Sequence, residues 1–177
     1  MVWVRSEYAP ELAVLSTWLS VLIPWNVFHG SVGGGSILLV RFPLLEIQYA
    51  FGVPLARATS LRDPLSAYQL QAGQSVAGAY AAWLVGAGVL LVAVAVSVHY
   101  YREEARAESW SVDPVRLLGS LLTATGVVFG VASVLLTGGL FGVDLGVGGG
   151  LAGTSIPLGV PFYLAFGVLL LRADRVE

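Results

Sequence analysis

The chain has 177 residues, of which 56% are apolar and 11% charged, and its formal net charge is −2. A soluble domain carries about 25% charged residues, so this composition indicates a multi-pass membrane protein. The absence of cysteine excludes disulfides, thiolate nucleophiles and cysteine-based metal sites, and the absence of a basic tract argues against nucleic-acid binding.

The first predicted element is a membrane span over residues 11–29. Its apolar run just reaches the minimum length of a spanning helix, about 17 residues. Trp25 and Phe28 suit an interfacial aromatic belt, and Pro24 is expected to loosen the last helical turn. A signal peptide is the alternative, but no small-residue cleavage site follows the run. We therefore expect a retained helix.

Residues 30–71 form an outer connector that is too polar to span. Residues 37–42 and 45–51 flank Pro43-Leu44, and the second segment alternates strictly between apolar and polar residues. This pattern predicts a β-hairpin with a four-residue turn, and an amphipathic helix lying in the interface is the alternative. The predicted register pairs Arg41 with Glu46, Val40 with Ile47 and Leu38 with Tyr49. One face is then apolar and the other carries an Arg–Glu pair.

Two Asp-Pro pairs mark the starts of the next helices, because Asp is a good N-cap and Pro suits the first turn. After Asp63, a single helix is predicted from Pro64 to Tyr101, with its apolar part spanning over residues 72–99 and its polar start protruding on the connector's side. After Asp113, a third span is predicted over residues 115–137.

Small residues at spacings of three and four predict where these helices pack, because such rows let helices approach closely in lipid. The third span carries Gly119, Thr123, Gly126, Gly130 and Ser133, and the second offers a matching row of Gly78, Ala82 and Gly86. The third span is therefore expected at the centre of the bundle.

A Gly-rich outer loop over residues 138–155, with a lone Asp144, precedes a fourth span over 156–172. The sequence thus predicts one domain: an all-α membrane protein with four transmembrane helices and a β-hairpin-containing outer loop between the first two. Arginines near the span ends favour cytoplasmic termini by the positive-inside rule. The termini's side has Arg5, Arg102, Arg106, Arg116, Arg172 and Arg175, and the other side has Arg41, Arg57 and Arg62.

Charged and aromatic residues of the outer loops form the candidate recognition surface, since arginine and aromatic residues are enriched in interface cores. They are Arg41, Glu46, Tyr49, Arg57, Arg62, Asp63, Tyr68 and Asp144. The alternative is that they only cover the bundle and contact headgroups. We find no catalytic, metal-binding or cofactor-binding motif. The lack of ionisable residues in the middle of any predicted span argues against a transporter.

Five stretches resemble a small family of uncharacterised haloarchaeal membrane proteins. They are 6–9 (Ser-Glu-Tyr-Ala), 40–43 (Val-Arg-Phe-Pro), 49–52 (Tyr-Ala-Phe-Gly), 63–68 (Asp-Pro-Leu-Ser-Ala-Tyr) and 99–103 (His-Tyr-Tyr-Arg-Glu). The resemblance implies a salt-loving source and no particular activity. In architecture the prediction is similar to claudins, but the Trp and paired-Cys motif of their outer loop is absent, so that similarity concerns shape only.

We therefore expect a non-enzymatic membrane protein without a cofactor, acting as an accessory, assembly or cell-envelope factor. Its expected surroundings are the lipid bilayer, and its expected partner is another membrane protein or a second copy of the chain, bound through the outer loops. A small transporter or channel subunit is the alternative.

Overall fold

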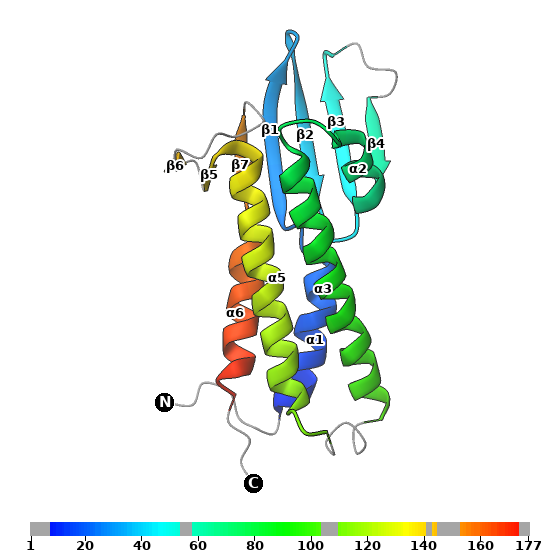
Figure 1. Cartoon of the computed structure of the whole chain (residues 1–177), viewed down its shortest axis with the longest axis vertical. Coiled ribbons are helices and arrows are strands. Elements are labelled where there is room, and N and C mark those ends of the chain that lie inside the picture. The colour runs from blue at the N-terminus through cyan, green and yellow to red at the C-terminus, as the bar shows by residue number, and fades with distance from the viewer. Residues whose placement is uncertain (1–7, 54–57, 104–109, 141–142, 145–152, 174–177) are drawn as a thin grey trace.

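A computed structural model describes residues 8–53, 58–103, 110–140, 143–144 and 153–173. Long helices pack side by side, and a β-sheet is attached at one end of them (Figure 1). The helices that pack side by side are α1 (Ala9–Leu22), α3 (Ala77–Arg102), α5 (Pro114–Thr137) and α6 (Val160–Leu171), and α2 (Pro64–Gln71) lies beside the sheet. The first residues of α1 and the last of α6 lie at the end away from the sheet (Figure 1).

The sheet has five antiparallel strands in the order β4-β3-β2-β1-β7. The strands are β1 (Asn26–Val32), β2 (Gly35–Arg41), β3 (Glu46–Phe51), β4 (Thr59–Arg62) and β7 (Thr154–Ile156), and a separate pair is formed by β5 (Gly139–Leu140) and β6 (Val143–Asp144). Strands β1 and β7 neighbour each other although they come from opposite ends of the chain.

The predicted hairpin is confirmed, and so is its register. Strand β2 pairs with β3 through Arg41↔Glu46, Val40↔Ile47 and Leu38↔Tyr49. The N–H of Phe42 donates to the carbonyl of Leu45 at 2.7 Å, which closes the expected four-residue turn. What the sequence did not predict is that the charged face packs against the helices.

The prediction of an all-α protein with four transmembrane helices is wrong. Among the described residues, two helices are long and apolar enough to cross a membrane, α3 and α5. The predicted first span divides into α1 and β1, because Ile23 precedes a proline and takes an extended conformation, with φ −84° and ψ 123°. The helix of the predicted fourth span, 156–172, begins only at Val160, because Ile156 ends β7 and Pro157 follows it.

The predicted continuous helix from Pro64 to Tyr101 is also wrong. It stops at Gln71 and restarts at Ala77, and Gly73 between them has a φ of 82°. This left-handed conformation is open to glycine at little cost and cannot continue a right-handed helix. The break leaves α2 beside the sheet and lets α3 run down the length of the helical part (Figure 1).

Helix α5 lies between its neighbours and packs against α3, α6 and α1. A Cβ added to Gly119 would come within 2.9 Å of the Gly167 carbonyl oxygen, and one added to Gly126 would come within 3.0 Å of Leu164. Gly130 faces Val160 in ordinary contact. The row of small residues on α5 therefore contacts α6, whereas on α3 Gly86 receives the ring of Phe129.

The closest helix contact predicts the outcome of a glycine substitution. In Gly167→Ala the new methyl group would meet the Thr123 backbone nitrogen at 2.7 Å and the Gly119 oxygen at 2.8 Å, neither of which can rotate away. Overpacking of this kind costs about 1–3 kcal/mol. We expect a lower thermal unfolding midpoint in detergent for Gly167→Ala than for the matched control Gly88→Ala, whose methyl group would meet open space. Equal midpoints would contradict this packing.

Candidate functional site

A buried ion pair lies where the sheet meets the helices. Arg41 of β2 is 0% exposed and Glu46 of β3 is 1% exposed. Arg41 Nε donates to Glu46 Oε2 at 2.8 Å. From α3, the Tyr80 hydroxyl accepts from Arg41 Nη2 at 2.9 Å and donates to Glu46 Oε2 at 3.0 Å. Three groups on three elements thus satisfy one another in a closed triangle.

The network continues on both sides of this triangle. Arg41 Nη1 donates to Asn26 Oδ1 at 3.0 Å, and Asn26 Nδ2 donates to Ser155 Oγ at 2.7 Å and to Ser133 Oγ at 3.2 Å. On the other side, Arg62 Nη1 donates to Gln48 Oε1 at 2.9 Å and approaches Glu46 Oε1 at 3.5 Å. The network therefore joins all five strands to α3 and α5.

Aromatic side chains of the core pack against the network. Trp25 stacks on Phe129 with ring centroids 5.0 Å apart, and Trp83 Nε1 donates to the Pro43 carbonyl at 2.9 Å, which holds the β2–β3 turn. The space between Trp25, Arg41 and Trp83 is too small for a water molecule, and the indole N–H of Trp25 has no hydrogen-bond partner. The network is thus a closed structural joint with no room for a substrate beside Arg41.

The structure separates the residues predicted as a recognition surface. The expectation that Arg41 and Glu46 face outward is wrong, because both lie under the sheet and can contact no partner directly. Arg62 joins them but stays partly exposed. Three of the other predicted residues lie away from the ion pair: Tyr49 is half-buried on β3, Tyr68 packs partly against the core, and Asp63 is exposed. Arg57 lies outside the described residues, and Asp144 is described only as part of the β6 backbone.

Asp63 instead caps the N-terminus of α2. Its carboxylate accepts from the backbone N–H groups of Leu65 and Ser66, both at 3.0 Å, and from the Ser66 hydroxyl at 2.5 Å. The hydrogen bond from the Ser66 side chain is the largest cause of a lowered pKa for Asp63. The predicted N-cap is therefore in place.

Sequence reasoning missed Asn26, Tyr80 and Ser155 as members of the network. Asn26 and Tyr80 lay inside predicted spans, and Ser155 lay in a predicted loop. One signal was available for Asn26: Pro24 disfavours a helical conformation at the preceding residue, which favours a helix end before Asn26. No sequence signal brings Tyr80 to Arg41, since they are 39 positions apart.

The free face of the sheet, turned away from the helices, carries three rows of side chains. The first row, nearest the helices, is apolar throughout: Val27, Val40, Ile47, Leu61 and Ile156. The second is mixed: Thr154, His29, Leu38, Tyr49 and Thr59. The third is Ser31, Ser36 and Phe51. In an antiparallel sheet with one solvated face, polar residues are expected on that face. Here the charges lie on the packed face instead.

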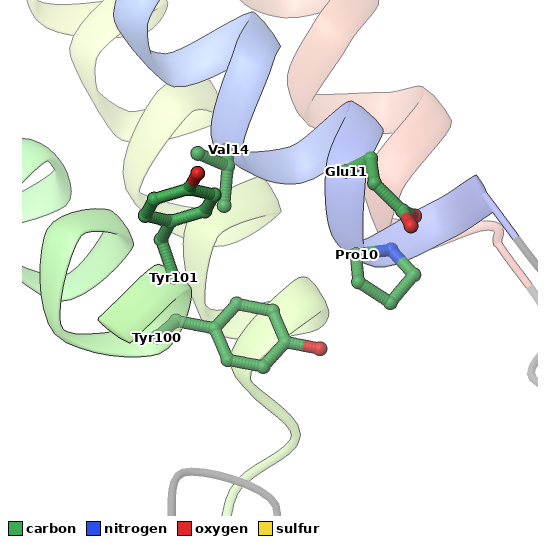
Figure 2. Close-up of a pocket in the computed structure, with 5 residues that line it drawn as sticks. All are labelled: Pro10, Glu11, Val14, Tyr100 and Tyr101. Atoms are coloured by element: carbon green, nitrogen blue, oxygen red, sulfur yellow. The ribbon is translucent and has the colours of Figure 1, made fainter. Parts of the chain in front are cut away.

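A second candidate, a surface pocket of about 160 Å³, lies at the end of the helices away from the sheet, lined by Pro10, Glu11, Val14, Tyr100 and Tyr101 (Figure 2). It is smaller than the roughly 300–1,000 Å³ of typical ligand pockets. In the described part of the chain, no three His, Asp or Glu residues come together to hold a metal ion. The buried network and the free face of the sheet remain the features to explain.

Comparison with known proteins gives a family and no activity. Residues 2–175 match the family described as "Family of unknown function (DUF7549)", so the chain belongs to this family. No curated protein matches the sequence. The resemblance to haloarchaeal membrane proteins stays a prediction.

The closed triangle predicts a specific effect of removing one oxygen. In Tyr80→Phe, Arg41 Nη2 loses its acceptor and Glu46 Oε2 loses a donor, both without access to water. Leaving buried polar groups unpaired costs about 1–3 kcal/mol. We expect a reduced thermal unfolding midpoint in detergent, and no change in Tyr101→Phe, whose side chain is exposed. If the two variants melted alike, the hydroxyl would contribute nothing to the joint.

Proposed function

We propose that this member of the DUF7549 family is an integral membrane protein that holds a β-sheet rigidly on the outer face of the bilayer. It would act there as an accessory or assembly subunit for another membrane protein. The observation that carries the proposal is the division of the molecule into helices that are apolar on the outside and a sheet fixed to their end by a buried ion-pair network.

The outward surface of the helices supports insertion into lipid. In the most apolar windows of α3 and α5, only 33% and 44% of the residues are buried. Core helices of a soluble protein would be buried over most of their length. Helices α1, α3, α5 and α6 all expose large apolar side chains: Leu15, Trp18, Leu19, Leu22, Val85, Leu91, Val92, Val127, Val131, Phe162, Val168 and Leu169. No charged residue lies between 12 and 22, 77 and 101, 117 and 137 or 160 and 171.

The distribution of arginine supports an outer location for the sheet. Exposed Arg102, Arg116 and Arg172 lie at the end of the helices away from the sheet. At the sheet end, Arg41 is buried with Glu46, and Arg62 is half-buried. The positive-inside rule therefore puts the sheet outside and the opposite end in the cytoplasm.

An accessory role fits the surface of the sheet end better than transport does. Several large apolar side chains there remain exposed, among them Phe51 on β3 and Leu65 and Leu70 on α2. Exposed apolar side chains with polar neighbours are typical of protein interfaces. A transporter or channel would need a path, whereas the small residues of α5 are occupied by contacts with α6.

The orientation can be measured by cysteine labelling, since the natural chain has no cysteine. Gln74 and Ser111 are both exposed and lie between helices at opposite ends of the molecule. We expect a membrane-impermeant maleimide to label Gln74→Cys in intact cells and Ser111→Cys only after permeabilisation. Labelling of both in intact cells, or release of the protein by alkaline carbonate, would refute the proposed insertion.

The partner can be captured with a photoreactive amino acid. We expect p-benzoylphenylalanine at Leu70 or Phe51 to give one discrete adduct with another membrane protein in native membranes. The same group at Val92, which is similarly exposed on α3, should give lipid adducts only. An accessory role is rejected if positions 51 and 70 yield no protein adduct, or only an adduct with a second copy of the chain.

A further inference from the structure

We infer that the sheet itself takes part in crossing the membrane. The first row of its free face (Val27, Val40, Ile47, Leu61 and Ile156) contacts lipid acyl chains. The chain then crosses the bilayer twice as a composite of helix and strand, once through α1 and β1 and once through β7 and α6. This inference rests on the proposed insertion of α3 and α5.

Helices α1 and α6 are too short to cross the hydrocarbon core by themselves. Helix α1 has 14 residues and α6 has 12, so at about 1.5 Å per residue they measure roughly 21 and 18 Å. The hydrocarbon core is about 30 Å thick. The missing 9 and 12 Å or so correspond to about three or four extended residues. Three or four residues added after Leu22 reach the start of β1, and about four residues added before Val160 reach the end of β7.

These two counts converge on one place in the structure. Val27 of β1 and Ile156 of β7 are paired directly with each other. A third count agrees, because Ser133 lies 133 − 116 = 17 positions after exposed Arg116 on α5, or about 26 Å. Ser133 Oγ accepts from Asn26 Nδ2, which places the first residue of β1 at that depth. The counts from α1 and α6 thus place the lower edge of the sheet at the boundary of the hydrocarbon, and the count from α5 places it about 4 Å inside.

The free face changes polarity in the order that this depth requires. The first row has no polar side chain, and its members Leu61 and Ile156 are exposed. The second row combines Leu38 with His29, Thr59, Thr154 and Tyr49, a mixture that suits the headgroup region. The third row adds Ser31 and Ser36 beside Phe51. A surface made to bind only water or only a soluble partner would not need this gradient.

The backbone of the sheet meets the main objection to strands in lipid, which is that peptide groups find no hydrogen-bond partner there. Strands β1, β2 and β3 are each paired on both sides. The edge strands β4 and β7 reach the row only at Leu61 and Ile156, near the boundary of the hydrocarbon. Arg41, Glu46 and Arg62 lie on the opposite face, where Glu46 bonds to Arg41 and approaches Arg62, and exposed Asp63 follows Arg62 as the N-cap of α2.

Nitroxide labels on single cysteines test the inference in the full chain reconstituted into phosphatidylcholine–phosphatidylglycerol liposomes. The test positions are Leu61 and Ile156, the lipid controls are Leu19 on α1 and Val92 on α3, and the third-row control is Phe51; all five are between 45% and 64% exposed. Collisions with oxygen report lipid, and collisions with a water-soluble nickel chelate report solvent. We expect the oxygen-to-nickel ratio at 61 and 156 to match the helix controls and to exceed that at 51 severalfold.

Each other outcome overturns a distinct claim. Nickel access at 61 and 156, with oxygen access at 19 and 92, would leave the membrane protein intact and reject the composite spans. Nickel access at all five positions would reject the insertion proposed above as well. Exclusion of both reagents at 61 and 156 would show that protein, such as a second copy, covers the row. Either test position alone decides the question if the other variant does not fold.

Discussion

The structure depends on the buried pair of Arg41 and Glu46. A charged pair removed from water is stable only when its remaining donors and acceptors are satisfied, and removing one partner typically costs about 3–5 kcal/mol. Here Tyr80 and Asn26 complete the hydrogen bonding. Because these two residues come from α3 and β1, the pair is satisfied in one placement of the sheet on the helices. The pair therefore determines where the sheet sits as well as how firmly it is held.

The sheet in turn covers the parts of α3 and α5 that the shorter helices α1 and α6 do not reach. Helices α1 and α6 end well before α3 and α5 do, so the upper parts of the long helices would be uncovered without it (Figure 1). Strands β1 and β7 continue from the short helices and pair with each other there. Asn26 of β1 and Ser155 of β7 turn inward to the network, and the paired Val27 and Ile156 turn outward. In a bilayer this is the favourable distribution, since lipid cannot solvate the polar groups.

The hairpin was predictable because its information is local. Strict alternation, a proline in the turn and complementary residues at Arg41 and Glu46 all lie within a few positions, and the observed register matches. The candidate site was predictable only in part, because Arg41, Glu46 and Arg62 were recognised but placed on the surface. Alternation separates the residues of a strand into two faces without saying which face is buried. In most soluble sheets the charged face is the outer one, and this sheet is the reverse.

The sequence by itself determined the apolar character of the chain, the bounds of the central helix from Asp113-Pro114 to Gly138, and the hairpin register. Each follows from neighbouring residues: composition, an N-cap with a C-terminal glycine, and a period of two. Tertiary structure decided that β1 and β7 become strands of one sheet, and that Arg41 lies against Tyr80. A strand needs a partner for its backbone groups, and a buried charge needs one for its donors. Both partners are supplied by residues far away in the chain, which no local pattern encodes.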